Sequence, residues 1–212
     1  MTIENVIIKR GINEILHFTT NSNFVGILDV HCVKPSKDLP QNRRLEYILQ
    51  INCPNRSRDI EWLNYVSLSI TCVNKYFFNI SKNKWHKNDV DWWCILSFRP
   101  EIMNHNRVVF CTTNNAYTNV VKRGYGTSGL EALFENQIVE YPSRTVARRH
   151  SSMPANQPTS IQAEVLYPGE LSLDYLQRIY VNEKEHASAI VSQWAIYFER
   201  QCVECVVRPD LF

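Results

Sequence analysis

The sequence lacks the long apolar runs of membrane proteins. No stretch approaches the ~20 consecutive apolar residues that a membrane-spanning helix needs. The first residues do not resemble a secretion signal either, because Lys9 and Arg10 soon interrupt the apolar positions. We therefore expect a soluble, cytoplasmic protein.

Two glycine-rich nucleotide-binding motifs are also missing. The chain contains neither GxGxxG nor GxxxxGK[ST], and its predicted strands and helices do not alternate strictly. This argues against a doubly wound dinucleotide-binding sheet and against a P-loop fold.

A second cysteine pair is absent as well. Of seven cysteines, Cys202 and Cys205 form the one CxxC pair, and no histidine pair has matching spacing. We therefore expect no metal site. The other cysteines sit mostly among apolar neighbours and are expected to be buried thiols; they are Cys32, Cys53, Cys72, Cys94 and Cys111.

What is present is enough for one substantial core. Hydrophobic residues make up 44% of the 212 positions, and the net charge of +2 does not by itself identify a nucleic-acid binder. Short alternating strands mixed with helices predict a single α+β domain over residues 1–212. Two long, basic, proline-containing segments at 34–58 and 140–160 are expected to be functional or mobile loops, the first with a short helix near 45–49.

Apolar periodicity predicts the elements. Strands are expected at 15–19, 65–70, 91–98, 107–111, 162–167 and 179–181, with an edge strand in 202–207. Helices are expected at 2–10, from Asn21 or Ser22, at 130–134 after Ser128, and at 183–201. In the last helix, the residues expected to face inward are Ala187, Ile190, Val191 and Trp194.

Two positions invite a chemical interpretation. Glu164 lies in a strand otherwise fit for burial, where an unpaired carboxylate is costly, so it is either used or on a solvated face. His17 and Thr19 project on one face of an early strand and can hydrogen-bond a ribose or an amide. The alternative for His17 is a packed imidazole with a backbone partner.

Four segments in this order resemble the DarT-type DNA ADP-ribosyltransferase toxins, over residues 15–181. The segments are His17-Phe18-Thr19, Tyr65-Val66-Ser67-Leu68-Ser69-Ile70, Phe110-Cys111-Thr112-Thr113-Asn114-Asn115-Ala116 and Gln162-Ala163-Glu164-Val165-Leu166. The similarity is greatest to the guanine-modifying branch. The thymine-modifying branch has an aromatic-rich segment ending in Pro-Arg-Ser-Pro-Met where this chain reads Leu68-Ser69-Ile70-Thr71-Cys72-Val73-Asn74.

The resemblance implies an ADP-ribosyltransferase-like fold, a split and mainly antiparallel sheet with flanking helices that grips NAD⁺ as substrate. Glu164 would hold the ribose 2′-hydroxyl and help to deprotonate the acceptor base. His17 and Thr19 would bind NAD⁺, and an arginine before Tyr65 would contact the diphosphate and share in the chemistry. Arg56 is favoured for that role over Arg58, which is kept among the NAD⁺ contacts. Further neighbours of the nicotinamide or ribose would be Tyr65 and Phe77.

The chemistry supports these residue types without the family. Breaking the glycosidic bond of NAD⁺ gives an oxocarbenium-like ribose, which a carboxylate stabilises. A guanidinium fixes a diphosphate by bidentate contact.

The basic loop before Glu164 predicts the acceptor. Its cationic side chains can neutralise phosphates and an aromatic residue can stack on a base, although a merely solvated loop is the alternative. The residues are Tyr141, Arg144, Arg148, Arg149 and His150. Because a base must leave its stack to be modified, single-stranded DNA is the expected substrate. The resemblance also implies a cognate antitoxin that removes or sequesters ADP-ribose.

Other functions remain open at this point. The same fold could act on RNA or protein, or the basic loops could belong to a non-catalytic nucleic-acid-binding module. A metal-dependent nuclease has less support because no ligand spacing is recognisable.

Overall fold

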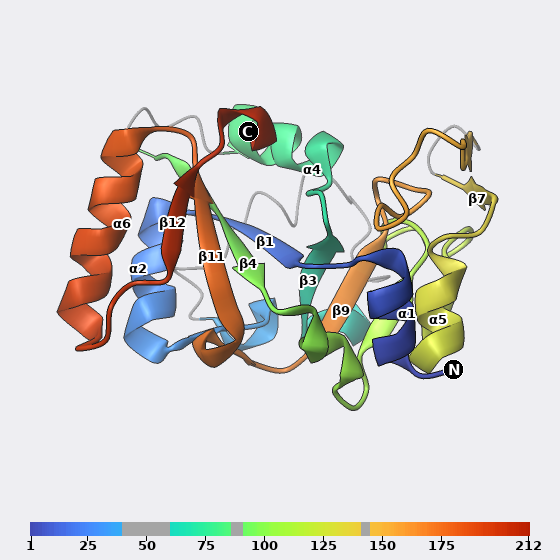
Figure 1. Cartoon of the computed structure of the whole chain (residues 1–212), viewed down its shortest axis with the longest axis horizontal. Helices are drawn as coiled ribbons and strands as arrows, with labels where there is room; N and C mark the ends of the chain where they lie inside the picture. The colour runs from blue at the N-terminus through green and yellow to red at the C-terminus, as the bar shows by residue number, and fades with distance from the viewer. Residues whose placement is uncertain (40–59, 86–90, 141–144) are drawn as a thin grey trace.

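An eight-stranded sheet forms the centre of the molecule (Figure 1). The structure is a computed structural model, and it describes residues 1–39, 60–85, 91–140 and 145–212. The strands of this sheet are β1 (Ile15–Thr20), β3 (Tyr65–Ile70), β4 (Trp93–Phe98), β5 (Val109–Cys111), β6 (Arg123–Tyr125), β9 (Glu164–Pro168), β11 (Leu176–Val181) and β12 (Glu204–Val207). The helix expected at 45–49 lies outside the described residues.

The sheet is mainly antiparallel, as expected. Its strand order is β12-β11-β4-β1-β3-β9-β5-β6, and β11 and β12 form a parallel pair at one edge. The other pairings in this sheet are antiparallel. Every predicted strand is present: β3 has the predicted bounds, and the bounds of the others shift by at most three residues. The α+β expectation is therefore confirmed.

The first two helices begin and end where local chemistry dictates. In α1 (Ile3–Arg10), the Thr2 side chain accepts the amide of Asn5, and Gly11 ends the helix with φ +65°. The helix α2 (Asn21–Val30) is capped by Thr20 rather than by Asn21 or Ser22. The hydroxyl of the last β1 residue therefore starts the next helix, and this fixes the direction in which the chain leaves β1.

Two later helices differ from the prediction. The helix α5 (Gly126–Ala132) starts earlier than expected, so Ser128 lies inside it and does not cap it. In α6 (Lys184–Tyr197), Ile190 and Trp194 are buried, but Val191 is 49% exposed. The prediction for Val191 was wrong because it lies one residue, and thus about 100° around the helix, from Ile190.

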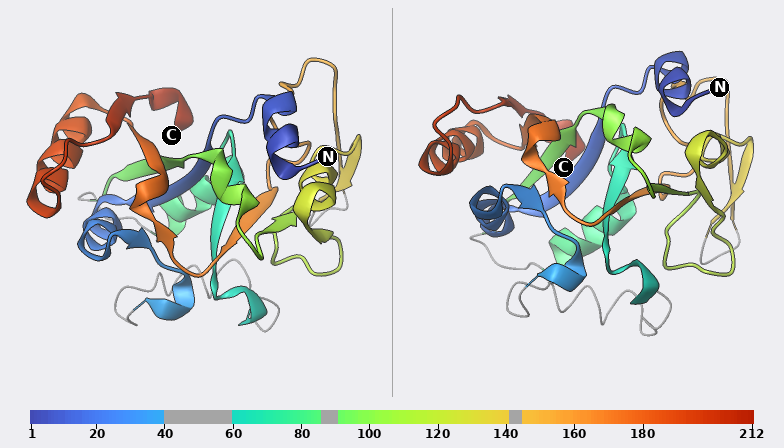
Figure 2. Two further views of the ribbon diagram at one scale, coloured as in Figure 1. Left: turned by 60° about the horizontal axis from the view of Figure 1, so that its bottom comes forward. Right: turned by 90° about the horizontal axis from the view of Figure 1, so that it is seen from below.

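The two faces of the sheet are covered differently (Figure 2). The main core contains residues of α1, α2, α5 and α6 packed on alternate positions of the strands, such as Ile15, Val165 and Ile179. The helix α4 (Lys75–Ile80) lies on the other face, where Phe78 contacts the rings of Phe18 and Trp93. The period of two along each strand separates these faces.

Smaller elements complete the described chain. Two further two-stranded sheets pair β2 (Cys32–Val33) with β10 (Leu171–Ser172), and β7 (Gln137–Val139) with β8 (Val146–Arg148). The segment 140–160 was expected to be a loop, but its beginning contributes β8 to a hairpin. Short helical turns are η1 (Ser36–Asp38), η4 (Ile60–Trp62), η5 (Ser81–Trp85), η6 (Pro100–Asn104), η7 (Leu173–Tyr175) and η8 (Pro209–Leu211).

The cysteines of the described residues are free thiols. Cys32, Cys94 and Cys111 are buried as expected, Cys72 is half-buried, and Cys53 lies outside the described residues. Burial raises the pKa of the Cys202 and Cys205 thiols to about 11. Within the described ranges, no group of three or more His, Cys, Asp or Glu residues could hold a metal ion. No helix there is long and apolar enough to cross a membrane.

Candidate active site at the fork of the sheet

The central sheet divides into two halves between β1 and β3. These strands pair at Ile15–Ile70 and Leu16–Ser69, after which β1 continues along β4 as far as Thr20. Meanwhile β3 continues along β9 as far as Tyr65. Past Leu16, the sheet therefore opens into a fork with β1 on one side and β3 on the other, which is the split that the resemblance implied.

His17 lies at the start of this fork. Its Nδ1 is 3.1 Å from the carbonyl oxygen of Ser67 on β3, so the imidazole bridges the two half-sheets. Since a carbonyl can only accept, Nδ1 carries the hydrogen, and Nε2 is left as an acceptor in the neutral ring. Burial lowers the pKa of His17, with the bond to Ser67 acting against it. The neutral form is thereby favoured, and it can accept a hydrogen bond from a hydroxyl or an amide.

Glu164 lies on the far side of β3 from His17, as the first residue of β9. The register that pairs Leu68 with Val165 brings Glu164 level with Ser69, at the closed end of the fork. The carboxylate is half-buried, and its Oε2 accepts the backbone N–H of Asn115 at 3.2 Å. This carboxylate is therefore held in one orientation at a strand end.

A network behind Glu164 joins β9 to the next two strands. Cys111 pairs with Glu164 on one side and with Arg123 on the other. Arg123 donates from Nε to Asn115 Oδ1 at 2.6 Å and from Nη2 to the Asn115 carbonyl at 2.8 Å. Burial, with Glu164 nearby, raises the pKa of the Cys111 thiol, so it stays protonated. Its Sγ lies 3.7 Å from Asn115 Oδ1.

The expected NAD⁺ contacts on β1 and α4 lie beside the fork. Thr19 is buried and shares the face of His17, two residues further into the open part. Phe77 is half-buried, with its ring centroid 5.8 Å from that of Phe18. Phe77 thus belongs, with Phe78, to the aromatic side chains of α4 that pack against Phe18 on β1.

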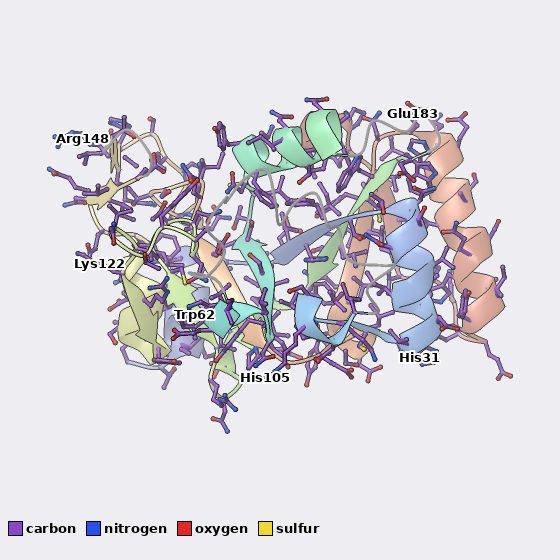
Figure 3. The ribbon with its side chains drawn as sticks, turned by 180° about the vertical axis from the view of Figure 1, so that it is seen from behind. His31, Trp62, His105, Lys122, Arg148 and Glu183 are labelled. Carbon is purple, nitrogen blue, oxygen red and sulfur yellow. The ribbon has the colours of Figure 1, made fainter. Side chains whose placement is uncertain are left out.

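Tyr65 is placed differently. It pairs with Pro168, at the end of β9 away from Glu164, and packs on Trp62 with ring centroids 5.3 Å apart. It also lines an open pocket together with Pro168 and Gly169. Tyr65 is the first residue of β3, whereas Phe77 lies on α4 after the other end of that strand, so the structure does not bring them together. Figure 3 shows Trp62 on the same side of the molecule as Lys122 and Arg148.

The basic residues of the described loop have unequal surroundings. Arg148, labelled in Figure 3, ends β8 and is exposed. His150 is exposed as well. Arg149 donates to the carbonyl oxygens of Gln157 at 2.7 Å, Pro154 at 2.8 Å and Ala155 at 3.3 Å. Its guanidinium is thus used to hold the 154–157 turn. Four predicted site residues lie outside the described residues: Arg56, Arg58, Tyr141 and Arg144.

The sequence matches a known family over most of its length. A family model described as "ssDNA thymidine ADP-ribosyltransferase, DarT" matches residues 16–208. The chain belongs to the DarT family. The match covers β1, with His17, and β9, with Glu164, and so includes both sides of the fork.

Solved DarT structures share the fold. Thermus sp. 2.9 DarT in complex with NAD⁺ superposes with a TM-score of 0.67 at 14% identity, covering 94% of this chain and 97% of that one. Thermus sp. 2.9 DarT in complex with ADP-ribosylated ssDNA gives 0.65 at 13% identity, covering 95% and 97%. Thermosipho africanus DarTG in complex with ADP-ribose gives 0.57 at 14%, covering 94% and 51%. No curated protein matches the sequence.

Two residues that contribute to the network around Glu164 were not predicted as site residues. Asn115 lies in one of the four segments that carry the resemblance, but no role was assigned to it. Arg123 follows a loop and carries no motif, so its approach to Asn115 follows from the pairing of β5 with β6. A polar residue eight positions before an arginine is too common a spacing to have identified the pair.

Proposed function

We propose that this protein is an NAD⁺-consuming ADP-ribosyltransferase, a pentosyl-transferring glycosyltransferase that modifies a base in single-stranded DNA. The observation that carries the proposal is the forked sheet, with neutral His17 in the fork and an oriented Glu164 on the far side of β3. Membership of the DarT family and the fold shared with NAD⁺-bound Thermus DarT support it. The activity is assigned to one domain over residues 1–212.

The proposed reaction places the nicotinamide ribose between the two half-sheets. Nε2 of His17 accepts a hydrogen bond from the ribose or the carboxamide, with Thr19 on the same face of β1 and Phe77 on the side of that strand covered by α4. The bond from ribose C1′ to nicotinamide breaks, and nicotinamide leaves with the electron pair. Glu164 holds the 2′-hydroxyl and stabilises the positive charge that develops on the ribose.

Transfer then forms the new bond from C1′ to the acceptor atom of the base. The acceptor loses a proton, which Glu164 helps to remove as a general base. Arg56 is assigned to the diphosphate and to a share in this step, with Arg58 as a further NAD⁺ contact. Tyr65 is retained as a more distant neighbour of the substrate, because it lies at the opposite end of the β3–β9 pair.

The DNA strand is assigned to the loop before Glu164. Arg148 and His150 are exposed there and can contact phosphates, and the same role is assigned to Arg144, with stacking on a base assigned to Tyr141. Arg149 contributes by holding the turn at 154–157, since its donors already bind three carbonyls. Binding of ADP-ribosylated ssDNA by Thermus DarT supports a single-stranded substrate.

Guanine is favoured over thymine as the acceptor, although the family description names thymidine. The segment 68–74, which departs from the thymine-modifying pattern, ends β3 and leads into α4, with Thr71 at φ +62°. Ser69 in this segment is level with Glu164. A different segment beside the carboxylate supports a different acceptor base.

Mass spectrometry of defined oligonucleotides incubated with NAD⁺ tests the proposal. We expect one added ADP-ribose on single-stranded oligonucleotides that contain guanine and none on those that contain thymine alone. The opposite selectivity would move this chain to the thymine branch. Modification of RNA or protein in place of DNA would retain the chemistry but change the substrate. NAD⁺ unchanged by all three polymers would indicate a non-catalytic binding module.

A toxin role with a cognate antitoxin completes the proposal. The support is indirect: Thermosipho africanus DarTG binds ADP-ribose, and this chain spans about half of its length. A partner that removes ADP-ribose from DNA would reverse the product made here. We expect expression of the wild-type chain to arrest growth and expression of Glu164→Ala to leave growth unaffected. Co-expression of such a partner should relieve the arrest.

A further inference from the structure

The hydrogen bond that Glu164 accepts comes from the N–H group of Asn115, which belongs to a loop and not to a neighbouring strand. Residues 112–122 connect β5 to β6, and the loop is closed at its base where the Thr112 amide donates to the Lys122 carbonyl at 3.0 Å. The Lys122 amide returns a bond to Thr112 Oγ1 at 3.1 Å. A loop of this length needs more than closure at its base to fix Asn115, a third of the way along it.

Arg123 supplies that further constraint. Its Nε and Nη2 grip the side-chain oxygen and the main-chain oxygen of Asn115 at 2.6 and 2.8 Å. The guanidinium carbon lies 5.1 Å from the centre of the Trp62 ring, which supports it from another side. Both oxygens of one residue are held by one planar group, so the direction of the Asn115 N–H toward Glu164 is fixed.

Losing the hydrogen bonds from Arg123 to Asn115 should affect the rate of catalysis most. A hydrogen bond to a carboxylate is charge-assisted and orients it strongly. A catalytic group displaced by about 1 Å can lose ~10²-fold in rate, even when the altered residue lies away from the reacting atoms. Loosening Asn115 would therefore affect turnover more than substrate binding.

We propose that Arg123 is a positioning residue for Glu164, acting through the backbone amide of Asn115. The proposal rests on the transferase function proposed above, since it assigns Arg123 to the same site. A direct role of the Arg123 charge is the competing explanation, and the two make different predictions for lysine at this position. Lysine keeps the charge but cannot present two donors in one plane.

Steady-state kinetics of Arg123→Ala and Arg123→Lys test whether the two hydrogen bonds from Arg123 to Asn115 position Glu164. With NAD⁺ and single-stranded DNA, we expect kcat to fall ~10–10²-fold in both variants, with KM for NAD⁺ near its wild-type value. Asn115→Ala keeps the main-chain oxygen and the amide, so its kcat should fall less. Wild-type kcat in Arg123→Lys, or a rise in KM alone, would overturn the proposal.

Arg178→Ala is the matched control. Arg178 also donates a short hydrogen bond to a side-chain oxygen, Glu204 Oε2 at 2.6 Å, but it lies on β11 near the opposite edge of the sheet. Its kcat and KM should equal those of the wild type. A comparable loss in Arg178→Ala would show that the Arg123 effect is general destabilisation.

An amide-resolved NMR measurement separates this proposal from the proposed function. In an otherwise wild-type chain, Glu164→Gln should shift the Asn115 amide proton upfield, because a charged acceptor becomes neutral. In the Arg123→Ala chain, the same Glu164 change should leave that proton almost unmoved. A full response without Arg123 would sink the positioning role, whether or not the protein transfers ADP-ribose. Absence of transfer by wild-type protein would instead sink the proposed function.

Discussion

Glu164 is the residue on which the proposed chemistry depends most. Its position at the first residue of β9 gives it a half-buried carboxylate with a fixed backbone donor. An amide of the same shape can still accept the Asn115 N–H, but it can neither take a proton nor stabilise a developing cation. Glu164→Gln therefore isolates the charge from the shape.

We expect Glu164→Gln and Glu164→Ala to lower kcat ~10²–10⁴-fold while NAD⁺ affinity changes little. Rapid-quench assays of transfer and calorimetric titration of NAD⁺ measure the two quantities. Glu170→Gln is the control, because Glu170 follows the same strand but forms an exposed ion pair with Lys34 at 3.2 Å. A folded Glu164→Gln protein with near-normal turnover would refute the assignment.

His17 offers a prediction at the same scale that involves pH. Burial lowers the pKa of His17 in the folded protein, whereas the unfolded chain has a value near ~6.5. As pH falls through that value, the unfolded state takes up a proton that the folded state resists, so the free energy of unfolding declines. The stabilisation from a neutral His17 is fully present above the pKa of the unfolded chain. It is lost as the pH falls toward the lower pKa of His17 in the folded protein.

Urea unfolding at pH 8 and pH 5.5 checks this for wild type and His17→Gln. The wild type should lose more stability on acidification than the variant, because glutamine does not titrate. At pH 8, His17→Gln or His17→Ala should weaken NAD⁺ binding ~2–10-fold, the effect of one lost hydrogen bond. Parallel pH curves for the two proteins would mean that His17 titrates normally.

At the scale of elements, β6 and α5 meet through two glycines. A Cβ on Gly129 would lie 2.4 Å from the carbonyl carbon of Gly124, and one on Gly124 would lie 2.7 Å from the Cα of Gly129. These are backbone atoms, so α5 and β6 would have to separate. Because Gly124 directly follows Arg123, the same displacement would reach the residue that holds Asn115.

Gly129→Ala should therefore lower the free energy of unfolding by ~1–3 kcal/mol and also lower kcat. Ser128→Ala, one position earlier on the exposed side of α5, should leave both nearly unchanged. Chemical denaturation together with transfer assays distinguishes the two. If Gly129→Ala lost stability but kept its full kcat, the link between this contact and the site would fail.

The sequence predicted elements better than their relations in space. The strand β3 follows from alternating apolar residues, the end of β11 follows from the apolar run 179–181, and α1 follows from Thr2, Gly11 and its apolar face. The hairpin of β7 and β8 was missed because each of these strands has three residues, which is too short for an alternating pattern to stand out in the sequence. The early start of α5 was missed because Tyr125 supplies no side-chain cap.

The candidate site shows the same division. Glu164 stood out locally, as a carboxylate in a strand fit for burial, and His17 stood out through its segment. The fork depends on where the β1–β3 pairing ends, and that is a long-range property of two strands some fifty residues apart. The two hydrogen bonds from Arg123 to Asn115 require the β5–β6 register, which alternation of apolar residues alone does not specify.

At the scale of the whole molecule, the charge is nearly balanced. With 23 Lys and Arg against 21 Asp and Glu, the net charge of +2 cannot attract DNA by a general field. The proposed DNA binding must therefore come from a local group of cations, and the described loop before β9 presents Arg148 and His150 to solvent. The neighbouring Arg149 is turned inward onto carbonyls, so adjacent arginines have separable roles.

Titrating single-stranded DNA at several salt concentrations should separate these two arginines. Arg148→Ala should weaken binding and reduce the slope of log Kobs against log salt by ~0.7, the value for one lost phosphate contact on a single strand. Its thermal unfolding and NAD⁺ affinity should match the wild type, because the residue is exposed and outside the fork. Arg149→Ala should instead lower the unfolding temperature, since the carbonyls of the 154–157 turn lose their donor, and should change the salt slope less. A larger slope change in Arg149→Ala than in Arg148→Ala would show that the guanidinium leaves the turn to meet DNA. Lost NAD⁺ binding with intact DNA affinity in either variant would place this loop over the NAD⁺ site and not along the DNA path.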